Sequence, residues 1–189
     1  MLSEWLGKNR QARHNFGQAR FYLRKAKIMW RFLAVFLLGG VLGTGFGVAL
    51  GFFAFPYVFP PPAAMDTLAE NEAETLVAKG TFIHANPSDP IHYGSGSVEV
   101  FEDLVFLKDD FKVGPGPKYH VYLVPKPEIR QNADLDDVMF IDLGRLRAFE
   151  GSQKYSIPAG IDLADYPSVV IWCEQFGVLI SPADLTFES

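Results

Sequence analysis

Hydrophobic residues follow two different patterns along this chain. From Phe32 to Phe55 the chain has 24 consecutive residues in an apolar run that contains no charge. As a helix with a rise of about 1.5 Å per residue, this run spans roughly 36 Å, enough to cross a hydrocarbon core of about 30 Å. From Leu76 onward, short segments rich in Val, Ile, Phe and Tyr alternate with turn residues, which indicates strands. The sequence therefore predicts one membrane-spanning helix followed by a β domain.

The second pattern predicts eight strands. Alternation of polar and apolar residues is clearest in 97–102 and 119–123, where it indicates one buried face. Gly, Pro, Asn and Asp separate the segments, as in turns. The predicted fold class is all-β, a β-sandwich with a partly closed barrel as the alternative, preceded by one N-terminal transmembrane α-helix. The predicted strands are Ala78–His84, Gly96–Glu102, Leu104–Lys108, Lys118–Val124, Val138–Leu143, Gln153–Ser156, Val169–Glu174 and Phe176–Ile180.

Charge is distributed unevenly between the two ends of the chain. Residues 1–31 carry eight Lys or Arg and one acid, whereas residues 66–189 carry 9 basic and 21 acidic side chains. Because basic flanks stay in the cytoplasm, we expect a cytoplasmic N-terminus and a periplasmic or extracellular β domain. The acidic domain would repel phosphate, which argues against nucleic-acid binding. The predicted parts are a basic cytoplasmic arm (1–31), a transmembrane helix (32–55), a Pro-rich and acidic linker (56–75) and the β domain (76–189).

The apolar run allows two further interpretations. A cleaved signal peptide would also export the domain, but its apolar region is about 7–15 residues long and follows a short basic segment. An uncleaved single-pass anchor fits this chain better. Gly39, Gly43, Gly47 and Gly51 form small-xxx-small motifs, which predict a homodimer, although Gly is common in membrane helices in general.

The β domain contains few residues with recognisable chemistry. Walker A, nucleophile-elbow, HExxH and CxxC motifs are absent from the sequence. The acidic stretch 134–137 lacks the Gly and Glu of an EF-hand loop, so a solvated turn is favoured over calcium binding. Cys173 is the single cysteine, which excludes an intramolecular disulfide. It lies beside Trp172 in an apolar segment, where a lone Cys is commonly a small core residue.

Several segments occur in the order typical of a known domain family. The segment 168–178 reads SVVIWCEQFGV and is followed by Ala183–Asp184–Leu185, and 92–102 reads HYGSGSVEVFE. Over about residues 79–187 the chain resembles the DM13 family, from which it departs in the altered segment Gly114–Tyr119 and by an insertion at Lys126–Asp137. The other matching segments are 80–82, 107–111, 114–115, 119–123, 143–146, 151–155, 157–158 and 162–163.

The resemblance implies a β-sandwich module that acts in electron transfer, often beside haem-binding domains, with the cysteine as redox group. Cys173 is then the redox candidate, Trp172 shields it, and the domain is a redox carrier rather than an enzyme with turnover. His92 matches the family's histidine and is the cofactor-binding candidate. Because soft sulfur and imidazole ligands select ions such as copper, Cys173, His92 and His120 are candidate metal ligands, with no cofactor as the alternative.

Two kinds of function remain open from the sequence. In the first, the domain exchanges electrons with a partner such as a cytochrome, since the chain has no CxxCH motif for its own covalent haem. In the second, the domain is a membrane-tethered binding module for an envelope partner, and it uses loops such as Lys126–Asp137. His84 and His120 also have an ordinary interpretation, as strand or turn residues satisfied by solvent or backbone.

Overall fold

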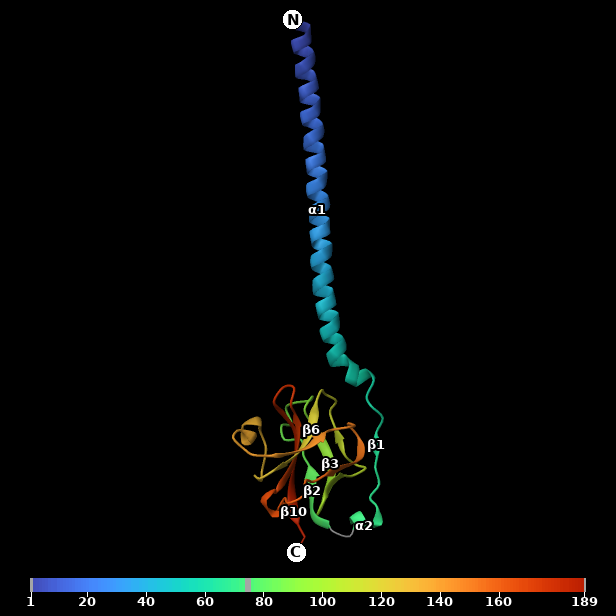
Figure 1. The fold of residues 1–189 in the computed structure, drawn as a ribbon, viewed down its shortest axis with the longest axis vertical. Helices are drawn as coiled ribbons and strands as arrows, with labels where there is room; N and C mark the ends of the chain where they lie inside the picture. The colour runs from blue at the N-terminus through green and yellow to red at the C-terminus, as the bar shows by residue number, and fades with distance from the viewer. Residues whose placement is uncertain (1, 74–75, 189) are drawn as a thin grey trace. The chain divides into compact units, whose positions relative to one another are not determined.

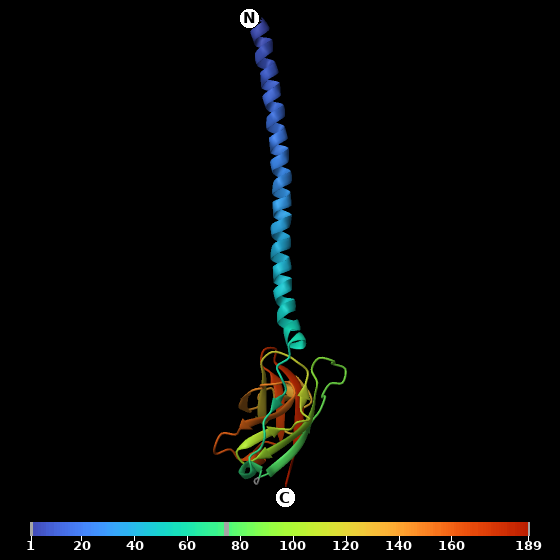
Figure 2. The same ribbon diagram turned by 90° about the vertical axis from the view of Figure 1, so that its right-hand side faces the viewer.

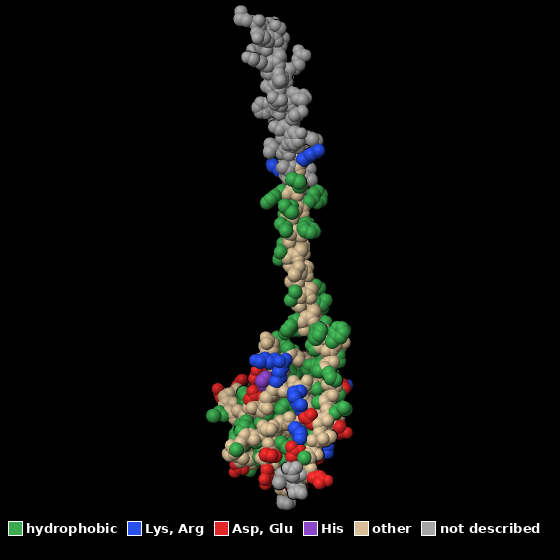
Figure 3. Space-filling view, turned by 45° about the vertical axis from the view of Figure 1, so that its right-hand side comes forward, with side chains coloured by type: hydrophobic (Ala, Val, Ile, Leu, Met, Phe, Trp, Pro, Cys, Tyr) green, Lys and Arg blue, Asp and Glu red, His purple; other side chains and the backbone are tan. Residues whose placement is uncertain are grey.

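Helix α1 runs through both the basic arm and the apolar run. In the computed structural model, which describes residues 2–73 and 76–188, it extends over Leu2–Val58. The most apolar 18-residue window of its part Met29–Val58 has a mean hydropathy of 2.1, and none of this window is buried within the chain. Figure 3 shows hydrophobic side chains along its surface. This helix is therefore long and apolar enough to cross a membrane.

The end of α1 differs slightly from the predicted end. Pro56 lies inside the last turn, and the helix ends at Val58, whereas the sequence predicted that Pro56 itself would end it. A proline lacks the N–H that would bond to the preceding turn. The N–H of Phe59 still donates to the carbonyl oxygen of Phe55 at 2.8 Å, so the helical hydrogen bonding continues beyond Pro56 and the helix ends at Val58.

The arm and the glycine repeat are only partly described. The basic side chains of Lys25, Lys27 and Arg31 are exposed, and the other basic side chains of the arm lie outside the described ones. Around the glycines that predict a homodimer, a Cβ atom would meet no atom within 4 Å. Dimerisation through this face stays a prediction.

The β domain consists of one ten-stranded sheet. Its strand order is β1-β8-β4-β3-β2-β10-β9-β6-β7, and β5 pairs with β3 outside this path. Figures 1 and 2 show the strands wrapped around a common interior. The strands are β1 (Ala64–Met65), β2 (Leu76–Phe82), β3 (Gly94–Phe101), β4 (Leu104–Leu107), β5 (Lys112–Val113), β6 (Tyr119–Val124), β7 (Ile141–Arg145), β8 (Gly151–Ser156), β9 (Ser168–Cys173) and β10 (Val178–Phe187). The described residues of this part also form the short helices α2 (Glu70–Ala73), η1 (Asn132–Leu135) and η2 (Leu163–Asp165).

The sheet curls so that its two ends approach each other. β7 and β8 lie near opposite ends of the strand order but follow each other along the chain. The segment between them closes the gap, since the N–H of Leu146 donates to Tyr119 and the N–H of Val113 donates to Phe149. The result is a half-barrel. The predicted all-β fold class behind one apolar helix is confirmed, in the more barrel-like of its two predicted forms.

Two apolar clusters hold the sheet. The inner cluster fills the half-barrel with alternate residues of β2, β3, β6 and β9, and Val98, Val121 and Ile171 in it are completely buried. The outer cluster lies on the opposite face of β6, β9 and β10, where Ile129 and Leu135 pack over Val170. Because strand side chains alternate between faces, the loop after β6 covers a second apolar surface that would otherwise face water.

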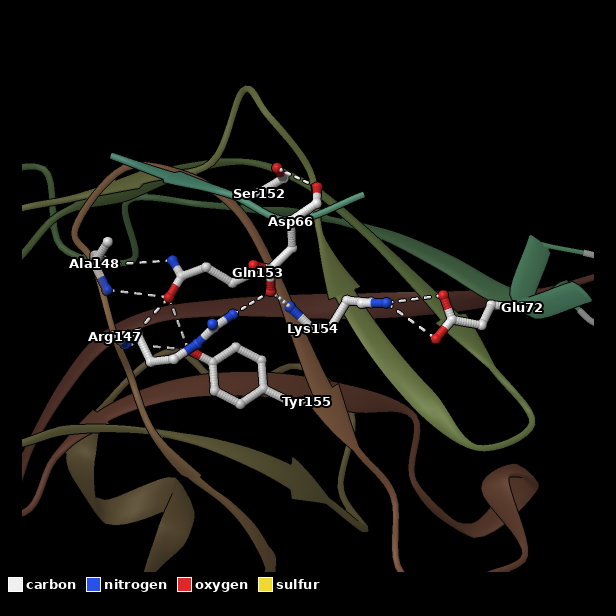
Figure 4. Close-up of polar contacts among 8 residues, drawn as sticks. All are labelled: Asp66, Glu72, Arg147, Ala148, Ser152, Gln153, Lys154 and Tyr155. Carbon is white, nitrogen blue, oxygen red and sulfur yellow. Dashed lines mark hydrogen bonds and ion pairs between the residues drawn. The ribbon is translucent and has the colours of Figure 1, made fainter. Parts of the chain in front are cut away.

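The segment before β2 is attached to the sheet by polar contacts. β1 pairs in parallel with β8, and the side chain of Asp66 accepts from the Arg147 guanidinium and from the N–H of Lys154, the latter at 2.9 Å. The Lys154 ammonium lies 2.9 Å from a carboxylate oxygen of Glu72. Figure 4 shows Asp66 between the two basic residues. Part of the segment that the sequence predicts as linker thus pairs with the domain.

Candidate functional site

The thiol of Cys173 lies inside the half-barrel, at the end of β9. Val169, Ile171 and Cys173 alternate along this strand and belong to the inner cluster. Cys173 is 1% exposed. Its cross-strand partners are Tyr119 on β6 and Val178 on β10, so the redox candidate is enclosed by core residues.

Main-chain groups provide the polar surroundings of the sulfur. The Cys173 thiol donates a hydrogen bond to the carbonyl oxygen of Pro117 at 3.2 Å. Burial raises the pKa of the thiol, and the N–H groups of Gln175 and Phe176, which bond toward the sulfur, lower it only in part. Cys173 is therefore a neutral thiol near pH 7, whereas nucleophilic attack and thiol exchange require an accessible thiolate.

The turn after β9 holds these N–H groups in place. The N–H of Gly177 donates to the carbonyl oxygen of Cys173 at 2.8 Å, and Gly177 has φ +61°. This left-handed backbone conformation costs other residues energy because their Cβ approaches the carbonyl oxygen. A glycine here lets the chain reverse tightly beside the sulfur and enter β10.

Trp172 lies on the other face of the sheet. Its side chain is half-buried and packs against the outer cluster with Tyr122 and Val170. Neighbouring residues in a strand point to opposite faces, so Trp172 and Cys173 are separated by the backbone of β9. Residues of the inner cluster therefore enclose the sulfur. Trp172 lies on the opposite face and does not shield it, in contrast to the prediction from the sequence.

His92 belongs to a loop organised by Asp89. One Asp89 carboxylate oxygen accepts from the N–H groups of Ile91 and His92, and the other lies 2.7 Å from Nδ1 of His92. These contacts, the His92 side chain first, lower the pKa of Asp89 to about 2. His84 Nε2 lies 2.8 Å from the carbonyl oxygen of Asp89. The loop residues His84 and His92 thus both have partners within the loop.

A pocket of about 580 Å³ lies between this loop, the insertion after β6 and β10. Its lining includes His92 and Asp89 from the loop, Arg130 and Asn132 from the insertion, and Leu179 from β10. The side chain of Asn132 accepts from the N–H of Leu179 at 2.8 Å, which fixes the insertion to β10. Cys173 does not line this pocket, so the pocket and the thiol are separate features.

A third feature lies on the outer face of β6, β7 and β9. His120 Nδ1 lies 3.0 Å from both carboxylate oxygens of Asp142, and His120 Nε2 lies 3.5 Å from Oε2 of Glu174. Among the side chains that the structure describes, these three form a group of His, Asp and Glu close enough to share a metal ion. The predicted metal candidates Cys173, His92 and His120 are therefore not brought together, and only His120 joins such a group.

Neighbouring side chains hold the Glu174 carboxylate. The Lys118 ammonium lies 2.8 Å from Oε2, and the Tyr122 hydroxyl donates to Oε1 at 3.0 Å. Both contacts, Lys118 first, lower the pKa of Glu174. Burial raises the pKa of Tyr122, and the bond to Glu174 adds to this shift. Glu174 is thus an ionised, oriented acceptor beside His120.

Sequence reasoning did not identify Asp142 and Glu174. Polar alternation in 119–123 could place His120 on the solvent side of its strand. It could not show which strands would flank that strand. That depends on the pairing of β6 with β7 and β9, including a register shift between Val121 and Tyr122. Long-range pairing of this kind leaves no local pattern.

The comparison with known families identifies the domain. The family described as Electron transfer DM13 matches residues 87–185, more than half of the chain. This segment contains His92, His120 and the turn around Cys173, but not β1 or β2. Neither a curated protein nor a solved structure matches the chain. From the extent of the family match, the chain belongs to the DM13 electron-transfer family.

Proposed function

We propose that the domain carries single electrons and that Cys173 is its redox group. The observation that carries the proposal is the position of Cys173, the single cysteine of the chain, in the core of the segment that matches an electron-transfer family. A buried thiol without a second cysteine has no route to an intramolecular disulfide. One-electron exchange with a partner fits this position better than thiol exchange does.

The proposed oxidation of Cys173 removes one electron and one proton from the thiol. The reduced state is the neutral Cys173 thiol, which is bonded to the carbonyl oxygen of Pro117. In oxidation, one electron passes to a one-electron acceptor on a partner protein, the S–H bond breaks and the proton passes to water, which leaves a sulfur radical. The reverse step consumes one electron and one proton. A haem protein such as a cytochrome is the class of partner that we propose.

Voltammetry of the full chain in lipid nanodiscs tests this proposal. We expect a one-electron wave in the wild type that is lost in Cys173→Ser. The matched control is Ser181→Ala, which changes another fully buried small side chain and should retain the wave. A wave of equal size in Cys173→Ser, or none in a folded wild type, would refute the redox role of Cys173. Thermal unfolding of each variant checks that the fold is retained.

We further propose that α1 anchors the domain with the N-terminus in the cytoplasm and the DM13 domain in the periplasm or outside the cell. The apolar span Met29–Val58 and the basic residues that precede it support this orientation. A protease added to spheroplasts, in which the cytoplasmic membrane stays closed, should digest a C-terminal tag and leave an N-terminal tag intact. Digestion of only the N-terminal tag would reverse the orientation.

A binding role is the second candidate. The pocket of about 580 Å³ supports it, because its wall includes Arg130 and Asn132 from the insertion that the sequence singles out. Its polar wall suits a small polar ligand better than an apolar one. If Arg130→Ala and Asn132→Ala abolish recovery of an envelope partner while Cys173→Ser retains it, binding rather than redox chemistry is the main role.

A further inference from the structure

His120, Asp142 and Glu174 form a cluster of metal-ligating groups outside the thiol site. They lie on or directly after the adjacent strands β6, β7 and β9, with ligand atoms within 4.8 Å of one another. We propose that this cluster binds a divalent transition-metal ion such as Zn²⁺. In this site His120 Nε2 and Glu174 Oε2 are direct ligands, and Asp142 orients the imidazole ring.

Asp142 fixes the orientation of His120. Both of its carboxylate oxygens lie 3.0 Å from Nδ1, and one of them also accepts from the N–H of Gly144 at 2.8 Å. An ionised carboxylate only accepts hydrogen bonds, so Nδ1 carries a proton. The lone pair of a neutral imidazole then lies on Nε2. The same carboxylate–histidine arrangement supports the histidine ligands of metal sites generally.

The gap between His120 and Glu174 fits an ion better than a direct hydrogen bond. Nε2 lies 3.5 Å from Oε2, beyond the usual 2.7–3.2 Å of an N–H···O bond. In a tetrahedral site with ligand bonds of about 2.0–2.1 Å, two ligand atoms are about 3.3 Å apart. A lone pair and a carboxylate oxygen that face each other at this separation repel unless a cation lies between them.

Lys118 is the competing cation at this site. Its ammonium lies 2.8 Å from the same Oε2 atom that faces His120, and its side chain is 52% exposed. The hydroxyl of Tyr122 holds the other oxygen of Glu174, so the carboxylate keeps its direction when Lys118 moves away. An exposed lysine can turn into solvent at little cost. Removing its charge should therefore strengthen metal binding.

The ligand types select the class of metal. An imidazole nitrogen combined with carboxylate oxygens suits zinc and copper, whereas Ca²⁺ and Mg²⁺ prefer oxygen ligands alone. The side chains of His120 and Glu174 are 14% and 26% exposed, so the cluster is open enough for water to complete the coordination. The site is independent of the proposed chemistry of Cys173, which faces the other side of β9.

Isothermal titration of the tag-free full chain in nanodiscs with ZnCl₂ tests the proposal. We expect one equivalent of Zn²⁺ that is lost in His120→Ala and in Glu174→Gln. Asp142→Asn should weaken binding by about 10- to 100-fold, as expected for a group that orients a ligand. Lys118→Met should tighten it. His92→Ala, which removes the histidine of another His–Asp pair, is the matched control and should bind Zn²⁺ as the wild type does.

Several results would overturn the site. The site is wrong if His120→Ala and Glu174→Gln both still bind one Zn²⁺, or if His92→Ala loses it. Weaker Zn²⁺ binding in Lys118→Met, or Mg²⁺ or Ca²⁺ binding as tight as Zn²⁺ binding, would also contradict it. Absence of Zn²⁺ binding to the wild type would do the same. Thermal unfolding without metal separates these outcomes from misfolding, because a folded His120→Ala variant that binds no Zn²⁺ supports a direct ligand.

Discussion

Replacing Gln153 by Leu should strongly destabilise the β domain. Gln153 is completely buried, and its side-chain oxygen accepts from the N–H groups of Arg147 and Ala148 and from the hydroxyl of Tyr155, at 3.1, 3.1 and 2.8 Å. Its amide group donates to the carbonyl oxygen of Ala148 at 3.0 Å. Figure 4 shows these contacts, by which one side chain fixes the segment between β7 and β8.

The magnitude follows from the groups that lose their partner. Leu has a similar size but no polar atoms, so the N–H and C=O of Ala148 and the hydroxyl of Tyr155 lose their bonds to Gln153. The N–H of Arg147 keeps a contact to the Tyr155 oxygen at 3.2 Å. Each buried unsatisfied group costs about 1–3 kcal/mol, so the three groups together predict a loss of about 3–9 kcal/mol in the free energy of unfolding.

Pulse proteolysis of the full chain in nanodiscs over a urea series measures this loss. The matched control is Lys154→Met on the same strand, where loss of the partly exposed ion pair with Glu72 should cost much less, because solvent screens such a pair. If Gln153→Leu lowers the free energy of unfolding by less than about 1 kcal/mol, the net contribution of one ordinary hydrogen bond, then buried hydrogen bonds do not close the half-barrel.

Three further changes test the loops and the attached segment. Gly177→Ala should cost about 1–2 kcal/mol in a urea titration, because φ is +61° and no atom obstructs the new Cβ; Gly177→Asn should cost less, and an equal cost would contradict the conformational explanation. Asp89 has a folded pKa of about 2 against an ordinary 3.8, so its contribution to stability is complete above the ordinary value and is lost as the pH falls toward 2. The urea midpoints of wild type and Asp89→Asn should therefore converge over this interval, and a constant difference would exclude the charge of Asp89 as the cause. Asp66→Ala should increase cleavage at Glu70 and Glu72 by a glutamate-specific protease, because Asp66 attaches the segment before β2 to Arg147 and Lys154; unchanged cleavage would mean that β1 alone holds it.

The parts of the fold that the sequence predicts are those governed by local periodicity. Alternation in 97–102 and 119–123 corresponds to β3 and β6, where one face enters the inner cluster. β1 and β5 have two residues each, too few for a period to be recognised. They exist because distant partners supply their hydrogen bonds. The parallel pairing of β1 with β8 is accompanied by contacts of Asp66 with Arg147 and Lys154, and no pattern in the neighbouring sequence predicts them.

In the candidate site, too, local sequence predicts some residues but not the contacts that they make. The sequence and the family resemblance indicate Cys173, and the nearly continuous apolar run of β9 agrees with its burial. Its environment could not be predicted, because Pro117 reaches the sulfur from a loop 56 residues away along the chain. The same holds for Glu174, which meets His120 only through the pairing of β9 with β6. Local patterns identify single residues, whereas the register of the sheet decides which of them meet.

The position of Cys173 also determines how an electron could reach it. The sulfur is 1% exposed, so in the proposed redox role a partner would not touch it and would exchange electrons through the wall of the domain. On one side of that wall lie core side chains such as Tyr119. On the other lie main-chain groups of Pro117, Gln175 and Phe176. Because a tight turn without buried bulky side chains is thinner than a packed core, a partner bound at the turn after β9 would bring its redox centre nearest to the sulfur.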